Sequence, residues 1–185
     1  MTHSLLDISG KVCLVTGGTS GLGKAIALGY AQAGAKVIAA SSNPDKVHAM
    51  QKELSAIGTG HDAIALNVTD AAAVDAALKH AAAKYGRLDA VVSAAGAHKK
   101  QPALEMSVEE YERIIRINLI GSFIVNQAAG KIMKDQTPDS KSVRGCIINI
   151  ASISSFMSLT EVIAYASSKT GVMGLTRGLA NEWAP

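Results

Sequence analysis

Aromatic residues are scarce in this chain of 185 residues, which has two Phe, one Trp and four Tyr, together 4%. Cysteine and proline are also rare, with two and four copies. These low counts exclude a disulfide-rich secreted scaffold and a proline-rich disordered chain. No apolar run approaches the length of a membrane span, and the first residues lack the basic start and apolar run of a signal peptide. We therefore expect a cytoplasmic protein that does not bind a membrane.

Neither basic nor acidic residues form a large cluster in the sequence. The net charge is +3, and the densest basic group is His98-Lys99-Lys100, so nothing in the sequence predicts a nucleic-acid partner. No cluster of His, Cys, Asp and Glu has metal-ligand spacing, so no metal is implied. Cys13 and Cys146 both lie in apolar, strand-like runs and are predicted to be small buried hydrophobic residues.

Hydrophobic residues are abundant, at 48%, and most of them are Ala, Val, Ile and Leu. Short apolar runs alternate with longer helical patterns, which is typical of parallel βαβ units. We predict an α/β fold, a Rossmann-type doubly wound parallel sheet in three layers, in a single domain over residues 1–185. The expected strands cover 11–16, 36–40, 62–68, 88–94 and 145–151, and the expected helices cover 24–33, 45–57, 70–85, 108–134 and 161–184. Ser107, with Glu110 three residues later, predicts a capping box at the start of the fourth helix.

A glycine-rich turn follows the first expected strand and leads into the first helix. Its sequence is Gly17-Gly18-Thr19-Ser20-Gly21-Leu22-Gly23. Glycine tolerates the backbone angles of such a turn and lets a pyrophosphate approach the main chain, while the helix N-terminus offers free N–H groups to the anion. The turn predicts a nucleotide-binding loop, although glycines needed only for a tight turn would give the same pattern.

The second expected strand ends in Ser41-Ser42-Asn43-Pro44. Dinucleotide-binding folds contact the adenosine ribose at this point, and an acidic residue there would accept hydrogen bonds from the ribose 2′-OH. No acid is present, so the sequence favours NADP over NAD. No arginine is present there either to bind the 2′-phosphate of NADP. Ser42 or Asn43 can also serve as the N-cap of a helix that starts with Pro44, and both interpretations can hold together.

Tyr165 and Lys169 are four residues apart in the last expected helix, so their side chains share one face. A lysine cation held beside a phenol favours the phenolate, and such a tyrosine can exchange a proton with an alcohol or carbonyl oxygen. Alone, a pair with this spacing is more typical of an ordinary solvated helix. Two other polar residues stand out: Asn118 lies inside a long helix, where asparagine is unfavourable, and Ser152 lies at the end of the fifth strand.

Taken together, these features resemble the short-chain dehydrogenase/reductase family. The matching motifs are the turn from Thr16 to Gly23, Ser93-Ala94-Ala95-Gly96, Asn118, Ser152 and the Tyr165-x-x-x-Lys169 pair, with thirteen residues between Ser152 and Tyr165. The resemblance implies an NAD(P)-dependent oxidoreductase. It also implies a cofactor site formed by Gly17, Thr19, Ser20, Gly21, Leu22, Gly23, Ser41, Ser42, Asn67, Val68, Ala95, Gly96, Tyr165 and Lys169.

The resemblance also implies a role for each catalytic residue. Tyr165 would act as general acid and base, Lys169 would favour its phenolate and bind the nicotinamide ribose, Ser152 would hold the substrate oxygen, and Asn118 would support a water-mediated proton relay. Hydride transfer to a carbonyl builds negative charge on its oxygen, which Ser152 and Tyr165 would stabilise. His98 lies near the expected substrate mouth and is a further candidate for a substrate contact.

A closer similarity is to gluconate 5-dehydrogenases and their relatives that act on deoxy-keto-sugar acids. It is carried by residues 101–107, by Asn149 to Ser152 with Ser155-Phe156, and by residues 179–184. We therefore expect a keto-sugar acid or polyol substrate, and a polar anion would suit His98-Lys99-Lys100. The alternatives are a reductase of 3-oxoacyl or steroid ketones and a truncated module that binds nucleotide or forms oligomers without catalysis.

The chain departs from the family pattern at three points. Asn67 stands where an Asp often contacts the adenine, and Ser93-Ala94 replaces two asparagines, which removes hydrogen bonds that steady the central sheet. The chain also ends soon after the Tyr165 helix, so we expect about five of the family's seven strands and no substrate loop. The helices at Val108 and Glu161 normally pair between subunits in this family, which implies a homodimer or homotetramer.

Overall fold

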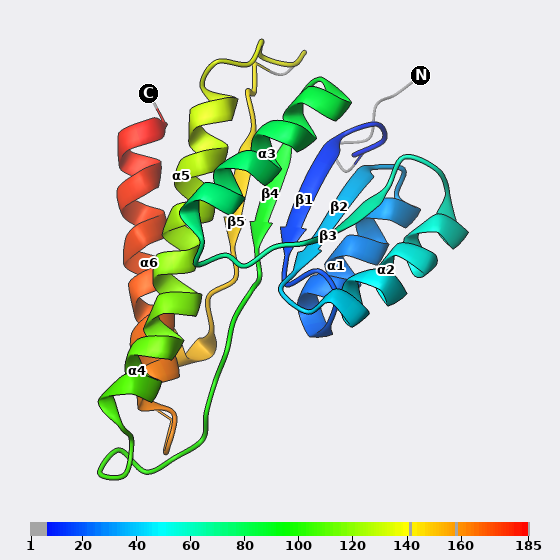
Figure 1. The fold of residues 1–185 in the computed structure, drawn as a ribbon. Helices are drawn as coiled ribbons and strands as arrows, with labels where there is room; N and C mark the ends of the chain where they lie inside the picture. Colours follow the sequence, from blue (N-terminus) through cyan, green and yellow to red (C-terminus); the bar gives the residue numbers. More distant parts are fainter. Residues whose placement is uncertain (1–6, 141, 158, 185) are drawn as a thin grey trace.

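The computed structural model describes residues 7–140, 142–157 and 159–184, and its centre is a sheet of five parallel strands (Figure 1). The strand order β3-β2-β1-β4-β5 confirms the predicted doubly wound α/β fold. The third, fourth and fifth strands are shorter than their apolar runs, because pairing stops before the runs end. The strands are β1 (Val12–Thr16), β2 (Lys36–Ser41), β3 (Asp62–Ala65), β4 (Ala90–Ser93) and β5 (Cys146–Asn149).

Helices cover both faces of the sheet. Alternate β1 residues show the division: Val12 and Leu14 pack towards α3 and α5, whereas Cys13 and Val15 pack towards α1 and α2. The helices are α1 (Gly21–Gln32), α2 (Pro44–Ile57), α3 (Ala71–Tyr85), α4 (Val108–Ile115), α5 (Gly121–Met133) and α6 (Ile163–Trp183). Among the residues that the structure describes, none of these helices is long and apolar enough to cross a lipid bilayer.

The helix starts predicted from capping residues are confirmed. Asn43 accepts a hydrogen bond from the Lys46 N–H (3.0 Å) ahead of α2, and Ser107 accepts one from the Glu110 N–H (3.2 Å) ahead of α4. The return bond of a capping box is not formed, because the Glu110 carboxylate pairs with both Nε and Nη2 of Arg113 at 2.8 Å. Asn43 therefore has the structural role that its position before Pro44 predicts.

The long helix predicted over residues 108–134 is interrupted. A π-helical segment, η1 (Arg116–Ile120), separates α4 from α5 and contains Asn118. A π segment adds one residue to a helical turn and is common at functional sites. The prediction of one regular helix was wrong at this point, because a single inserted residue hardly changes the apolar pattern along the chain.

The prediction that both cysteines are buried is confirmed for Cys13 and wrong for Cys146. Burial raises the pKa of the Cys13 thiol to about 12, with a smaller contribution from Asp89. Cys146 lies in β5, an edge strand of the sheet, and Ile148 on the same face of β5 is 37% exposed. No helix in the described residues covers this face, so the apolar character of β5 does not lead to burial.

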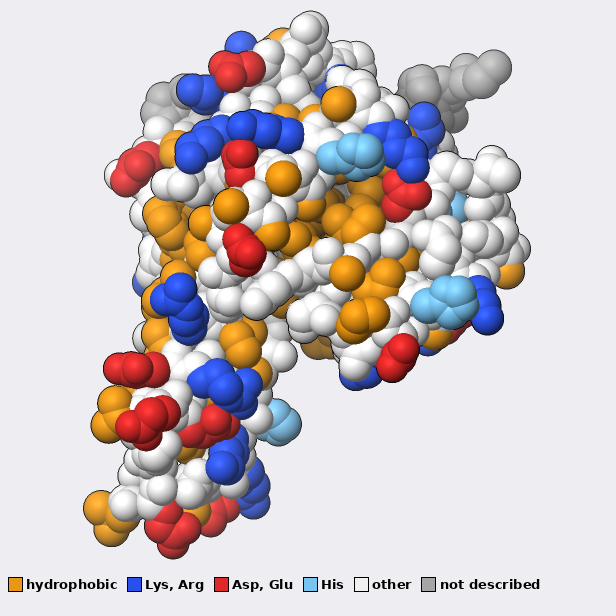
Figure 2. All heavy atoms as spheres, viewed as in Figure 1, with side chains coloured by type: hydrophobic (Ala, Val, Ile, Leu, Met, Phe, Trp, Pro, Cys, Tyr) orange, Lys and Arg blue, Asp and Glu red, His pale blue; other side chains and the backbone are white. Residues whose placement is uncertain are grey.

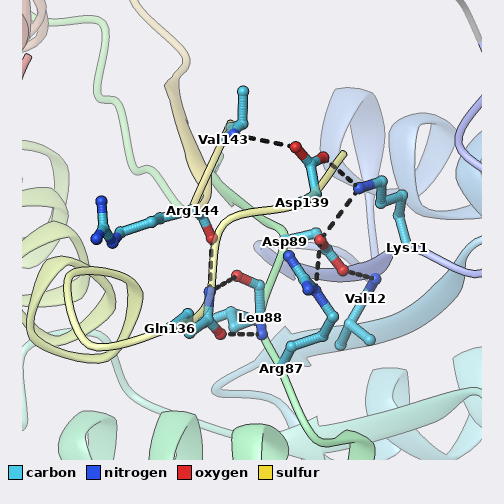
Figure 3. A network of polar contacts seen from close by, with 9 residues as sticks. All are labelled: Lys11, Val12, Arg87, Leu88, Asp89, Gln136, Asp139, Val143 and Arg144. Carbon is cyan, nitrogen blue, oxygen red and sulfur yellow. Dashed lines mark hydrogen bonds and ion pairs between the residues drawn. The ribbon is translucent and has the colours of Figure 1, made fainter. Parts of the chain in front are cut away.

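A charged network ties together the amino ends of β1 and β4 (Figure 3). The buried Asp89 carboxylate accepts hydrogen bonds from the Val12 N–H (2.9 Å) and Arg87 Nε (2.7 Å), and Lys11 Nζ lies 3.4 Å away. Lys11 also pairs with Asp139 at 2.8 Å, and this bond raises the pKa of Lys11. Through Asp139, the loop between α5 and β5 is attached to the start of the sheet.

Candidate active site

The glycine-rich turn between β1 and α1 packs so closely that side chains cannot enter it. Gly17 has φ +66°, and a Cβ there would lie 2.8 Å from the Ala94 carbonyl oxygen. A Cβ on Gly18 would lie 2.7 Å from the Val15 carbonyl oxygen. The turn therefore requires glycine at these two positions for steric reasons, while Ser20, Gly21 and Leu22 are exposed at the start of the helix.

The N-terminus of α1 has no side-chain cap. Ser20 occupies the N-cap position with an extended backbone and makes no capping hydrogen bond. The first N–H groups of α1 thus have no partner from the Ser20 side chain, and they carry the partial positive charge of the helix dipole. Thr19 is buried in the turn, whereas Leu22 is 70% exposed beyond it. The glycine-rich turn and the uncapped N-terminus of α1 together fit the phosphates of a dinucleotide.

Thr16, at the end of β1, holds the neighbouring loop after β4 in place. Its Oγ1 accepts hydrogen bonds from the N–H groups of Ala94 (3.2 Å) and Ala95 (3.3 Å). Ser93 is buried and donates to Asn126 Oδ1 at 2.9 Å. The sequence suggested that replacing two asparagines by Ser93 and Ala94 would weaken this part of the sheet, but these bonds provide local support.

The residues expected near the adenosine lie at the carboxyl ends of β2 and β3. Ser41 Oγ accepts a hydrogen bond from the Asn43 N–H (3.3 Å), and Ser42 is exposed. Asn67 is exposed and uses its Oδ1 within its own turn, accepting from the N–H and the hydroxyl of Thr69 at 3.1 and 3.0 Å. The next residue, Val68, is buried. The side-chain oxygen of Asn67 is thus hydrogen-bonded to Thr69. The side-chain NH₂ of Asn67 is the group that can bind a ligand.

Asn118 connects three segments of the site. It is fully buried, and its Oδ1 accepts a hydrogen bond from the Ala97 N–H (2.7 Å). Its Nδ2 donates to the Ala97 carbonyl and to Ser168 Oγ, both at 2.9 Å. Asn118 is therefore a buried amide with its side-chain hydrogen bonds satisfied, which explains how it is accommodated inside a helical segment.

Tyr165 and Lys169 lie together on the first turns of α6. Lys169 Nζ lies 5.7 Å from the centroid of the Tyr165 ring, a distance at which a cation acts on an aromatic ring. Lys169 is only 5% exposed and donates to the Ile150 carbonyl at 2.6 Å, and burial lowers its pKa. The His98 ring contacts Tyr165 edge-on, with the ring centroids 6.2 Å apart. The structure thus brings together Tyr165, Lys169, Asn118 and His98.

Ser152 is less directly connected to this group. It follows β5 and starts a short 3₁₀ helix, η2 (Ile153–Ser155), where its Oγ accepts a hydrogen bond from the Ser154 N–H at 3.1 Å. Within the described residues, Ser152 and Tyr165 share no direct hydrogen bond. The loop that carries Ser152 follows β5 at the same end of the sheet, as the sequence predicted.

Two partners of the catalytic candidates were missed by the sequence reasoning: Ser168, which contacts Asn118, and the carbonyl of Ile150, which contacts Lys169. Serines that bond to their own helix are common, so the position of Ser168 in the sequence gave no specific signal. A backbone carbonyl carries no sequence signal at all.

Charges of both signs surround the mouth of the site. Lys100 pairs with Glu161 at 3.2 Å, and the Gln101 N–H donates to the Glu161 carbonyl at 2.7 Å. The Arg113 hydrogen bond and, more weakly, the charge of Lys99 lower the pKa of Glu110. Figure 2 shows acidic and basic side chains alternating over the projecting end of the molecule that contains α4. The basic group His98-Lys99-Lys100 is therefore partly compensated.

Comparison with known proteins gives a consistent result. A family model described as short chain dehydrogenase matches residues 11–185. D-threitol dehydrogenase of Mycolicibacterium smegmatis is 39% identical over 176 residues, which are 95% of this chain and 65% of that protein. The 2-dehydro-3-deoxy-D-gluconate 5-dehydrogenase of Escherichia coli is 35% identical over 184 residues, which are 100% of this chain and 70% of that protein.

Solved structures agree with these sequence matches. A short-chain type dehydrogenase/reductase from Mycobacterium marinum superposes with a TM-score of 0.89 at 36% identity, covering 97% of this chain and 71% of the other. The chain thus spans about two thirds of the length of the curated relatives it matches, at 65% and 70%. It belongs to the short-chain dehydrogenase family.

Proposed function

We propose that this member of the short-chain dehydrogenase family is an NAD(P)-dependent oxidoreductase that interconverts a secondary alcohol and its carbonyl, with Tyr165 as general acid and base. The observation that carries the proposal is the position of the Lys169 cation 5.7 Å from the Tyr165 ring, beside the buried amide of Asn118. Such a pair suits proton exchange with an alcohol or carbonyl oxygen.

The cofactor would lie along the carboxyl ends of the strands. Gly17, Thr19, Ser20, Gly21, Leu22 and Gly23 would hold its phosphates, and Ser41, Ser42, Asn67 and Val68 would border its adenosine. Ala95, Gly96, Tyr165 and Lys169 would flank its nicotinamide ribose. The bound nicotinamide supplies the hydride-transfer chemistry. The absence of an acid at residues 41–43 favours NADP over NAD.

The residues of this chain would handle the proton. Tyr165 would give its phenolic proton to the carbonyl oxygen of the substrate, or take one from the alcohol in the opposite direction. The charge of Lys169 would favour the phenolate, and Ser152 would donate a hydrogen bond to the same substrate oxygen. Asn118 would hold the loop at Ala97 close to this group and support the relay of protons through water.

A neutral polyol is the substrate class that the charges favour. Lys100 is paired with Glu161, and acidic and basic groups alternate around the mouth, so an anion would gain little there. Activity on a polyol is also what the name of the Mycolicibacterium smegmatis relative states. A keto-sugar acid is the second candidate, because the Escherichia coli relative is named for one and because His98 lies beside Tyr165.

We also propose that the chain forms a homodimer or homotetramer through the helices that start at Val108 and Ile163. These helices lie side by side on the outside of the molecule (Figure 1). A groove of about 510 Å³ between α5, α6 and β5 is lined by apolar side chains that include Met133, Leu179 and Trp183. An exposed apolar groove of this kind is typical of a surface that is covered in an assembly.

The direct test is turnover of the 185-residue chain with NADPH and NADH. The substrate panel should contain D-threitol, a keto-sugar acid, a 3-oxoacyl thioester and a steroid ketone, and each should be assayed with the wild type and with Tyr165→Phe. We expect turnover of the polyol that Tyr165→Phe abolishes. A folded protein that binds NADPH but turns over no member of the panel would instead support a non-catalytic nucleotide-binding module.

A further inference from the structure

We propose that Ser168 is a positioning residue that fixes the orientation of the Asn118 amide and thereby holds the first turn of α6, with Tyr165 and Lys169, against the loop at Gly96 and Ala97. Its effect on catalysis rests on the function proposed above. The positioning itself rests on the hydrogen bonds of Ser168 and is testable without turnover.

The hydrogen bonds of Ser168 have only one consistent assignment. A serine hydroxyl has a single proton and can accept further bonds. Ser168 Oγ donates that proton to the Tyr165 carbonyl at 2.7 Å, so it must accept from Asn118, whose amide nitrogen lies 2.9 Å away. The NH₂ side of Asn118 therefore faces Ser168, and its carbonyl side faces away.

The orientation set by Ser168 is the one that the loop requires. The Ala97 N–H needs an acceptor, and Asn118 Oδ1 supplies it at 2.7 Å, while the Ala97 carbonyl accepts from Nδ2 at 2.9 Å. In the reversed orientation the NH₂ group would face the Ala97 N–H, and the amide oxygen would face the Ala97 carbonyl. Ser168 and Ala97 thus favour the same orientation of the Asn118 amide, and Ser168 connects that amide to α6.

Lys169, which donates to the Ile150 carbonyl at 2.6 Å, lies against the same loop. A Cβ on Gly96 would be 3.4 Å from Asn118 Oδ1 and 4.0 Å from Lys169 Nζ, so the loop rests on both side chains. Ser168 is fully buried, and water therefore cannot readily replace its hydroxyl. Without that hydroxyl, one N–H of Asn118 loses its partner, and the link from Asn118 to the helix carrying Tyr165 is broken.

The adjacent residue provides a matched control. Ser167 is half-buried in the same helical turn, and no hydrogen bond of its hydroxyl occurs among the described residues. If Ser168 acted only as a serine in a helix, alanine at 167 and at 168 would have similar consequences. If Ser168 acts through Asn118, only the change at 168 alters the surroundings of Tyr165.

The experiment is a pH titration of the four tyrosines labelled with ¹³C at Cζ, followed by NMR, with the Tyr165 signal assigned from Tyr165→Phe. The titratable groups that contact the Tyr165 ring in the described structure are Lys169 on α6 and His98 on the loop. In Ser168→Ala the first turn of α6 loses its link to Asn118, so the titration curve of Tyr165 should differ from that of the wild type. In Ser167→Ala it should match that of the wild type.

Ser168→Cys keeps the number of side-chain heavy atoms while weakening both hydrogen bonds, and it replaces Ser168→Ala if that variant does not fold. A Tyr165 titration curve that is unchanged in the folded variant, or that changes equally in Ser167→Ala, would overturn the proposal. With an active wild type, kcat of Ser168→Ala should fall by about tenfold, whereas kcat of Ser167→Ala should stay at the wild-type value. Absence of turnover in the wild type would refute the proposed function, while the titration would still decide the role of Ser168.

Discussion

The polar groups at the two ends of the sheet are of opposite kinds. At the amino ends of β1 and β4, charged side chains meet: Asp89 accepts from Arg87 and lies next to Lys11, which also pairs with Asp139. At the carboxyl ends, the neutral pair Asn118 and Ser168 lies near Lys169, the buried cation of the described residues, which donates to the Ile150 carbonyl. The first network fastens loops to strands, and the second leaves one charge uncompensated beside Tyr165.

This difference has a physical consequence for function. Paired charges neutralise one another and contribute mainly to stability, whereas an unpaired buried cation acts on whatever lies next to it. The carboxyl end is therefore suited to altering the proton affinity of a neighbouring group, and the amino end is not. Substitutions at the two ends should accordingly affect different measurable quantities.

The largest expected effect is on turnover. Tyr165→Phe should lower kcat by about 10²–10⁴-fold, because the proton donor and acceptor is removed. The free energy of unfolding should hardly change, since the Tyr165 hydroxyl makes no hydrogen bond within the described residues. Turnover within about tenfold of the wild type would exclude Tyr165 as the general acid and base.

A new charge at the carboxyl end should be the most destabilising of the isosteric changes. Asn118→Asp places carboxylate oxygens against the Ala97 carbonyl and Ser168 Oγ in a fully buried site, so we expect a loss of about 3–5 kcal/mol in the free energy of unfolding. Urea denaturation of the wild type and of Asn118→Asp measures this loss in the free energy of unfolding. Asn181→Asp, an exposed position on the same helix as Tyr165, is the control and should cost less than about 0.5 kcal/mol.

The reverse substitution at the amino end should also destabilise, but less. The Asp89 carboxylate accepts hydrogen bonds from the Val12 N–H and Arg87 Nε. Asp89→Asn replaces one of its two acceptor oxygens by an NH₂ donor, and we expect a loss of about 1–3 kcal/mol in the free energy of unfolding. The affinity for NADPH should remain that of the wild type. Asp75→Asn, which breaks only an exposed pair with Lys79, serves as the control, and an equal loss there would mean that the network has no special role.

The smallest expected effect depends on pH. His61 Nδ1 accepts a hydrogen bond from the Val37 N–H at 3.2 Å, and burial lowers the His61 pKa from 6.5. The folded state thus favours the neutral ring, so His61 contributes stability above about pH 6.5, which is lost as the pH falls. His61→Gln should reduce the loss of stability between about pH 7.5 and 5.5, as measured by urea denaturation at the two pH values.

Local sequence signals predicted the parts of the fold that depend on local chemistry. The caps at Asn43 and Ser107 and the glycine turn at Gly17 were identified from residue type and spacing, and the structure confirms their geometry. The spacing of Tyr165 and Lys169 also predicted that their side chains share one helical face, whereas their catalytic role was implied by the family resemblance.

Features that depend on contacts between distant segments were not predictable. The π segment around Asn118 is stabilised by bonds to Ala97, and the network around Asp89 joins residues far apart in the chain. The exposure of Cys146 depends on what covers β5, which its own apolar neighbours do not reveal. Each of these features is a property of the packing rather than of a sequence window.

One parallel measurement tests the division between the two ends most directly: turnover and the free energy of unfolding, determined together for Tyr165→Phe and Asp89→Asn. We predict that Tyr165→Phe loses at least about 10²-fold in kcat at unchanged stability. Asp89→Asn should lose about 1–3 kcal/mol while its folded fraction retains the wild-type kcat. If Asp89→Asn impaired kcat as strongly as Tyr165→Phe, or if Tyr165→Phe were fully active, the proposed site at the carboxyl end would be wrong.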